Sequence, residues 1–218
     1  MKKFLIIFFL CIFTLTAYAQ DESGLTLEAK CAIELLKKTK LLTEDFDFSS
    51  NPTRIEYLTM LIKIDNFTSA ESNSIDIVLA EDTVSKYSDV KELSDEQKCI
   101  IAEADLKGIL KGRAFENVVL AEPHSKIAWR EALIFSLRMV TNFDRDFYEN
   151  DDQRLLDVSQ NYGLIDYTLC DLSNLSWLDE TLSYDKACIL TYRLLHAPAK
   201  RNAFGGEYTK YYIDDYIF

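Results

Sequence analysis

The residues Thr53-Arg54-Ile55-Glu56 carry the clearest chemical signal in the chain. Thr53 and Glu56 have the spacing of a capping box, in which a threonine caps a helix and a later glutamate reaches back to it. Arg54 is then free to project from the first turn. A guanidinium at a helix N-terminus is a good carboxylate receptor, because its donors and the unpaired backbone N–H groups converge on one anion. Taken by itself, however, Arg54 is better explained as an ordinary exposed residue.

Patterns typical of catalysis or metal binding are absent, so we expect no enzyme, no cofactor and no metal site. The sequence contains no G-x-S-x-G, no H-E-x-x-H and no P-loop. The acidic runs 144–146 and 149–152 lack the ligand spacing of a calcium loop and are interpreted as solvated linker. His124 and His196 are isolated and are interpreted as loop or surface residues. A hydrolase hidden in degenerate repeats stays open as a third class of function, although no pair of carboxylates is nominated.

The N-terminus predicts an exported protein of the cell wall or cell surface. Residues 1–19 combine Lys2-Lys3, an apolar run and Ala17-Tyr18-Ala19, which is typical of a secretory signal. No later segment reaches the roughly 18 apolar residues of a membrane span. The net charge of −12 argues against nucleic acid as a partner, because phosphate binding needs clustered Lys and Arg. An acidic glycan held in a small basic pocket is compatible with this charge.

An internal repeat must position these residues. A short anchor that follows a helix occurs three times, at Lys40-Leu41-Leu42, Gly108-Ile109-Leu110 and Gly163-Leu164-Ile165. Each anchor is followed by a loop and a second helix with one basic residue; these helices open at Thr53, Ala128 and Ser183 and carry Lys63, Arg138 and Arg193. Apolar positions recur at three and four residues, as in a half-buried helix. The pattern predicts a mainly α-helical fold of three helix–loop–helix units that bury their faces against each other.

The alignment predicts the boundaries of the units: repeat 1 at 25–66, an inter-repeat segment at 67–86, repeat 2 at 87–141, an acidic linker at 142–151, repeat 3 at 152–197, and an aromatic and acidic tail at 198–218. Ser94 and Gln97 predict a capping box. Gly108 and Gly163 predict helix ends in a left-handed conformation, whereas the turn at Lys40 is expected to be built differently. Residues 75–79 predict an extra strand or buried loop, and 111–125 an irregular loop.

The cysteines left after the predicted signal leave two interpretations open. They are Cys31, Cys99, Cys170 and Cys188. An even number permits two disulfides in an exported chain, and four separate buried thiols are at least as consistent with the sequence. Cys188 aligns with Leu58 and Leu133, so we expect it to be a small buried apolar residue.

The order of these features resembles the S-layer homology domain. Tyr87-Ser88-Asp89-Val90 is similar to the aromatic-x-Asp-Val lead-in of that family, Gly108-Ile109-x-x-Gly112 to its turn, and Phe115 to its buried loop aromatic. The resemblance implies a pseudo-threefold arrangement of three repeats with grooves between them. Proteins of this family attach to cell-wall polysaccharide, typically a negatively charged, pyruvate-bearing polymer.

The resemblance also implies the ligand-binding residues: Arg54, Thr53, Glu56, Trp129, Arg130, Glu131, Gly108, Gly112 and Tyr184. Arg54 would be the glycan anchor, while Thr53 and Glu56 would cap its helix. Trp129 and Tyr184 occupy the arginine position in repeats 2 and 3 and would stack on sugar faces or pack internally. The basic residues of the three second helices would ring a shared groove or, as is commoner, snorkel beside a buried stripe.

The sequence therefore predicts an exported, non-enzymatic module that attaches non-covalently to an anionic, pyruvylated-type cell-wall polysaccharide. The alternative is an envelope scaffold or protein-interaction factor, with a protein partner, that keeps degenerate repeats without binding glycan.

Overall fold

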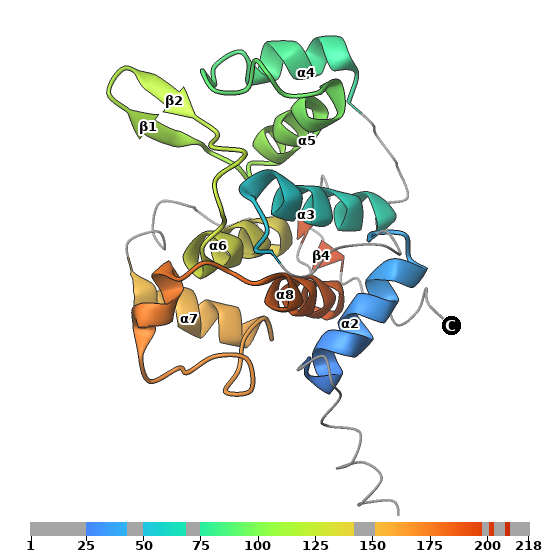
Figure 1. Ribbon diagram of the computed structural model, residues 1–218, viewed down its shortest axis with the longest axis vertical. Helices are drawn as coiled ribbons and strands as arrows, with labels where there is room; N and C mark the ends of the chain where they lie inside the picture. The colour runs from blue at the N-terminus through green and yellow to red at the C-terminus, as the bar shows by residue number, and fades with distance from the viewer. Residues whose placement is uncertain are drawn as a thin grey trace, which may run out of the picture.

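The chain is mainly helical, as its sequence predicts. The computed structural model describes residues 25–42, 50–68, 75–141, 151–197, 201–202 and 208–209. These residues form seven α-helices (Figure 1): α2 (Leu27–Lys38), α3 (Arg54–Thr68), α4 (Ile77–Val84), α5 (Asp95–Leu106), α6 (Trp129–Val140), α7 (Asp152–Asn161) and α8 (Tyr184–His196). The predicted signal, most of the acidic linker and most of the tail lie outside the described residues. None of the described helices combines the length and the apolar character that crossing a membrane requires.

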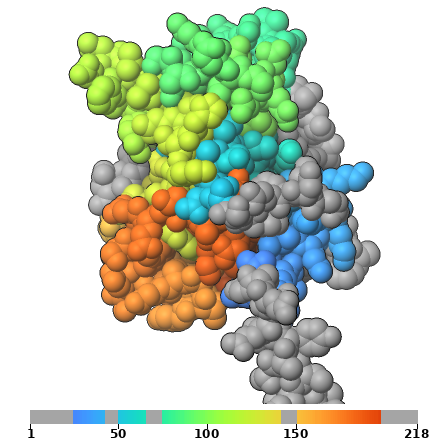
Figure 2. Space-filling model, in the orientation of Figure 1, coloured from blue at the N-terminus to red at the C-terminus, as the bar shows by residue number. Residues whose placement is uncertain are grey.

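The remaining elements are short. β1 (Arg113–Phe115) pairs antiparallel with β2 (Val118–Leu120), and β3 (Arg201–Asn202) pairs antiparallel with β4 (Tyr208–Thr209). In the first hairpin Ala114 lies opposite Val119. A 3-10 helix, η2 (Leu175–Asp179), precedes α8. The hairpin of β1 and β2 projects from the body of the molecule beside α4 and α5 (Figures 1 and 2).

The helices that lead into the three anchors all begin with a side-chain N-cap. A side-chain oxygen of the N-cap residue accepts a hydrogen bond from a backbone N–H in the first turn; the N-caps are Thr26, Ser94 and Asp151. Gln97 completes a capping box with Ser94, its Oε1 accepting from the Ser94 N–H at 3.1 Å. This confirms the predicted capping box and satisfies N–H groups that the helix itself leaves without partners.

The same helices also end alike. The residue at each anchor has a left-handed backbone, with φ of 59° at Lys40, 65° at Gly108 and 70° at Gly163. In each turn the residue that follows the left-handed one donates its backbone N–H to a carbonyl of the preceding helix. The bonds run from Leu41 to Leu36 at 2.8 Å, from Ile109 to Ala104 at 2.7 Å and from Leu164 to Ser159 at 2.8 Å. The expectation of a different turn at Lys40 is therefore wrong. Lysine adopts the left-handed conformation because the hydrogen bond and the buried Leu41 outweigh its steric cost.

The second helices form the centre of the molecule. α3, α6 and α8 contact one another, while α5 packs on α3, α7 on α6 and α2 on α8. Between α3 and α6 the buried Tyr57 hydroxyl lies 2.7 Å from the Ser136 hydroxyl. Leu58, Leu133 and Cys188 are fully buried, as the alignment predicts for Cys188. Burial raises the pKa of the Cys188 thiol to about 12, so this cysteine is a protonated core residue. No disulfide joins the four cysteines of the described residues.

Short hydrogen-bonded bridges connect the segments that enter these helices. Thr53 bridges to Lys126, and Ala128 bridges to Thr181. The first N–H of α3, from Arg54, donates to the Ser125 carbonyl at 2.9 Å, and the first N–H of α6 donates to the Glu180 carbonyl at 3.1 Å. These bonds give the helix N-termini the partners that they lack inside the helix.

Three expectations about local structure are wrong. Residues 75–79 form neither strand nor buried loop: Asp76 caps α4, accepting from the Val78 N–H at 3.1 Å, and Val78 is 72% exposed. A short apolar run does not distinguish strand from helix, and the cap decides here. Residues 111–125 are not wholly irregular, since they include β1 and β2. Phe115 is 59% exposed, not buried.

Candidate cationic cavity

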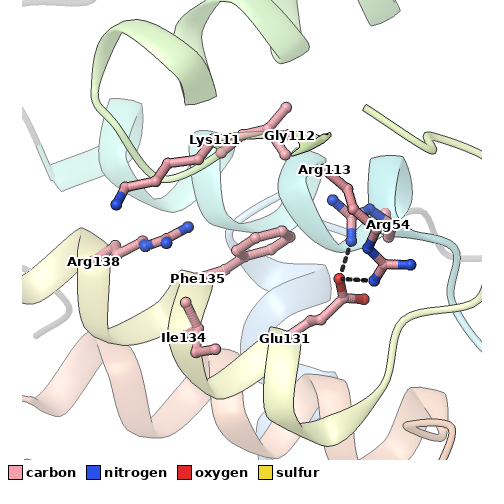
Figure 3. A pocket seen from close by; sticks show the side chains of 9 residues that line it. Arg54, Lys111, Gly112, Arg113, Glu131, Ile134, Phe135 and Arg138 are labelled. Carbon is pink, nitrogen blue, oxygen red and sulfur yellow. Dashed lines mark hydrogen bonds and ion pairs between the residues drawn. The ribbon is translucent and has the colours of Figure 1, made fainter. Parts of the chain in front are cut away.

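A small cavity opens between the N-terminal part of α3, the segment that leads into β1, and one face of α6. Its volume is about 220 Å³. We call it the cationic cavity; its lining residues are Arg54, Leu110, Lys111, Gly112, Arg113, Glu131, Ile134, Phe135 and Arg138 (Figure 3).

The start of α3 places Arg54 at this cavity. The Thr53 N–H and hydroxyl donate to Glu56 Oε2 at 2.6 and 2.7 Å, which confirms the predicted cap. Burial by itself would raise the pKa of Glu56, but the hydrogen bonds from Thr53 outweigh it and lower the pKa. Because Thr53 and Glu56 satisfy each other and do not line the cavity, their role here is to set the position of Arg54.

Arg54 is held more tightly than the sequence predicts. Its side chain is buried, its Nε donates to the Ala121 carbonyl at 3.0 Å, and its Nη1 pairs with Glu131. The guanidinium carbon also lies 5.4 Å from the ring centroid of Phe135. The expectation that Arg54 projects freely is therefore wrong, although it does lie in the cavity wall.

The partner of Arg54 follows from the sequence at the start of α6. The N-cap residue there is Ala128, which makes no side-chain cap. Glu131 occupies the helix position that Glu56 has in α3, but it has no hydroxyl to pair with. Its carboxylate therefore turns to the cations at the cavity, where Arg54 is buried and needs a counter-charge.

A second guanidinium reaches the same carboxylate from the hairpin. Arg113 Nη2 lies 3.3 Å from Glu131 Oε1, and its Nη1 lies 3.1 Å from Glu122 Oε2. The Arg113 side chain is 60% exposed. This residue is therefore the solvent-accessible member of the wall, in contrast to the buried Arg54.

Gly112 and Asp89 fix the hairpin above the cavity. Gly112 has φ +72°, and an added Cβ would lie 2.5 Å from Tyr87 and 2.7 Å from Val119. Only glycine permits this conformation together with such close packing. At the same end of the hairpin, just after β2, Asp89 accepts hydrogen bonds from the N–H groups of Ala121 and Glu122, at 2.9 and 2.7 Å. The predicted Tyr87–Asp89 lead-in is thus the support of the hairpin.

Lys111 and Arg138 lie on the other side of Phe135 from Arg54 and Arg113 (Figure 3). Arg138 Nη1 donates to the Ile109 carbonyl at 2.8 Å, which ties α6 to the anchor turn. Among the described residues, the cavity thus gathers four basic side chains and a single carboxylate, that of Glu131. Leu110, Ile134 and Phe135 supply apolar wall. In a chain of net charge −12, this is a local concentration of positive charge suited to a small anion.

The structure brings together only some of the residues predicted as ligand-binding. Arg54, Glu131 and Gly112 line the cavity, and Gly108 forms the turn beside it. Trp129 is buried, with its ring 5.1 Å edge-on to Trp177, and Tyr184 is buried at the start of α8.

Arg130 lies apart from the cavity and joins three elements. It pairs with Asp152 at the start of α7, and its Nε lies 3.0 Å from Asp179 in η2. Among the basic residues of the second helices, Lys63 is exposed and Arg193 pairs with Glu28. Arg138 is the member of that set that lines the cavity, so the three do not ring a shared groove.

Lys111 and Arg113 are missing from the predicted site. Their signal in the sequence is their position on both sides of Gly112, the last residue of the family-like turn. Charge on a loop is usually solvated, so these residues became candidates only when the hairpin placed them beside α6.

Comparison with known proteins adds no identity to this geometry: no family model, curated protein or solved structure matches the chain. The described residues also contain no cluster of His, Cys, Asp or Glu that could hold a metal ion.

Proposed function

We propose that this protein is an exported, non-enzymatic binding module of three degenerate S-layer-homology-like repeats, and that its cationic cavity attaches it to an anionic polysaccharide of the cell envelope. The observation that carries the proposal is the cavity itself, where four basic side chains and one carboxylate surround about 220 Å³ in an acidic chain.

Three sets of contacts support the repeat architecture. The anchor turns have the same left-handed residue and the same hydrogen bond. The bridge from Thr53 to Lys126 has its counterpart in the bridge from Ala128 to Thr181. Each second helix packs on the first helix of the next unit, α3 on α5, α6 on α7 and α8 on α2, so the order closes on itself. A pseudo-threefold arrangement accounts for all three.

The cationic cavity, rather than the next groove of the alignment, would bind the ligand. In the next groove by this alignment Trp129 replaces Arg54, Asp166 replaces Lys111 and Thr168 replaces Arg113. The arginine that corresponds to Arg138 is Arg193, which is neutralised by Glu28 and by Asp166 at 3.2 Å. The cations at the positions of Arg54, Lys111 and Arg113 are thus absent from that groove, and we expect the ligand to bind at the cationic cavity rather than there.

The lining favours a carboxylate next to an apolar group. Guanidinium groups present two parallel donors that match the two oxygens of a carboxylate. Leu110, Ile134 and Phe135 offer apolar surface beside the charges and exclude water from them. A pyruvate ketal on a sugar has both features, a carboxylate and a methyl group, and would suit the cavity.

Co-sedimentation with purified cell-wall material tests the proposal. Lys111→Ala and Arg113→Ala should each weaken pelleting by roughly tenfold, because each removes one cation from a partly enclosed anion site. Arg113 is the better target than Arg54, since it is exposed while Arg54 is buried in an ion pair. Pelleting should also decrease at high salt.

Lys63→Ala is the matched control, since Lys63 is an exposed cation of α3 that does not line the cavity. It should pellet like the wild type. Wall material whose carboxylates have been chemically reduced should bind none of the proteins. Wild-type protein that stays in the supernatant, or variants that pellet as well as it does, would contradict the proposal.

A protein-interaction role is the second candidate, and the β1–β2 hairpin is the feature that favours it. Phe115 is 59% and Val118 42% exposed on this projecting element. A partner that is captured by the wild type and lost with Phe115→Ser, in a protein that does not pellet with wall material, would support this role instead.

A further inference from the structure

Glu131 is a carboxylate in the wall of a cavity that is proposed to bind an anion, where a negative charge opposes binding. One of its oxygens, Oε1, serves both Arg54 and Arg113. We propose that Glu131 is an internal counter-anion, which occupies one side of the empty cavity and is displaced from the two arginines by the carboxylate of the ligand. The inference rests on the proposed function and adds to it a residue that lowers the affinity of the site.

The two sides of the cavity differ in what they offer a ligand. On the side of Arg54 and Arg113 the charge is already partly neutralised by Glu131. Across Phe135 lie Lys111 and Arg138, and Glu131 is the acidic residue that lines the cavity within the described part of the chain (Figure 3). A ligand anion would reach Arg54 and Arg113 only by competing with Glu131.

The surroundings allow this competition. The Glu131 side chain is 22% exposed and Arg113 is 60% exposed, so both have room to move, whereas the buried Arg54 stays in place. After displacement the Glu131 carboxylate would remain in the first turn of α6, where the helix dipole favours negative charge. Glu131 thus protects Arg54 from being buried without a partner while the cavity is empty, at the expense of affinity.

The test compares binding of one small probe, a methyl glycoside that carries a 4,6-linked pyruvate ketal, by isothermal titration calorimetry. Glu131→Gln keeps the shape and an oxygen acceptor for Arg54 but removes the competing charge. We expect it to bind the probe roughly tenfold more tightly than the wild type, with a steeper loss of affinity as salt is added.

Glu122→Gln is the matched control. It also removes a carboxylate partner of Arg113, at 3.1 Å, but Glu122 does not line the cavity. We expect its affinity to stay within about twofold of the wild type. If Glu131→Gln does not fold, Glu131→Asp provides the same comparison, since a shorter side chain withdraws the charge from both arginines and should also tighten binding.

The outcomes separate the two proposals. A wild type that binds the probe, with an equal or weaker Glu131 variant, overturns the counter-anion role and leaves the proposed function in place. If the wild type and every variant fail to bind, the proposed function fails and the inference falls with it. An equal gain for Glu122→Gln and Glu131→Gln would show a general effect of net charge and would also overturn the inference.

Discussion

Two glutamates in the third position of their helices have different partners because of the residue that precedes each helix. Glu56 accepts from the Thr53 N–H and hydroxyl. Glu131 follows Ala128, which offers no hydroxyl, and pairs with Arg54. A single methyl side chain in place of a hydroxyl-bearing one thus turns a capping residue into the counter-charge of a buried arginine.

Lys40 gives a prediction at the same scale. It adopts φ of 59° in a turn where the two equivalent residues are glycines. Lys40→Gly should raise the free energy of unfolding by about 1 kcal/mol, because glycine has no Cβ to strain in this conformation. Denaturant unfolding followed by circular dichroism measures the change.

Gly163→Ala is the reciprocal substitution. An added Cβ would meet no atom within 4 Å, so any cost comes from the backbone conformation alone. It should lower the free energy of unfolding by about 1 kcal/mol. For the Lys40→Gly variant, a lower free energy of unfolding would contradict the prediction, because it would show that contacts of the lysine side chain stabilise the fold by more than the left-handed backbone destabilises it.

Between elements, the N-terminal ends of α6 and α7 are joined by charge. Arg130 in the first turn of α6 pairs with Asp152, the first residue of α7, and with Asp179 of η2. The hydrogen bond from Arg130 lowers the pKa of the Asp152 carboxyl below its ordinary value of 3.8. The same pairing raises the pKa of Arg130. This contact holds the start of α7 against the first turn of α6.

The lowered pKa makes the contact sensitive to acid. A carboxylate whose pKa is lower in the folded state stabilises the fold above its unfolded pKa, and this contribution is lost as the pH falls through the folded value. Asp152→Asn should therefore be less stable than the wild type near neutral pH, and the difference should shrink below about pH 3.8.

Urea unfolding at a series of pH values measures this difference. Asp157→Asn is the control, because Asp157 is an exposed residue of the same helix that bonds Gln153 rather than Arg130. It should follow the pH dependence of the wild type. A constant gap between Asp152→Asn and the wild type at every pH would contradict the prediction.

At the scale of the molecule, the beginning and end of the helical body are joined by one arginine. Arg193 of α8 pairs with Glu28 of α2 through Nε and Nη2, at 2.5 and 2.8 Å, and also with Asp166. The Arg193 side chain is 10% exposed, so its partners determine whether burying it is favourable. The closure of the fold therefore depends on a contact between residues far apart in the sequence.

Glu28→Ala should weaken this closure. We expect the free energy of unfolding to fall by about 1–2 kcal/mol, because Arg193 loses one of its carboxylates while remaining largely buried. Hydrogen exchange should increase first in the amides of α2. Glu34→Ala, at an exposed position of α2, should leave both measurements unchanged. Equal effects of the two substitutions would show that α2 is sensitive to any loss of charge.

Helix positions and turns were largely predictable because residues close together in the chain decide them. The capping boxes of Ser94 and Thr53 and the left-handed glycines at 108 and 163 are local patterns that need no knowledge of the fold. The errors were also local: Lys40 tolerates a glycine conformation, and Asp76 starts a helix where the apolar run predicts a strand or buried loop.

The site was predictable only in part. The sequence predicts Arg54, Gly112 and Glu131 as ligand-binding residues. It does not predict that Glu131 is the partner of Arg54, and it omits Lys111 and Arg113 as binding residues. Local spacing is sufficient to place a helix end, since its hydrogen bonds close within a few residues. The charge in the cavity depends instead on how α3, α6 and the hairpin pack together. Only that packing brings the guanidinium groups of Arg54 and Arg113 to the same carboxylate oxygen of Glu131.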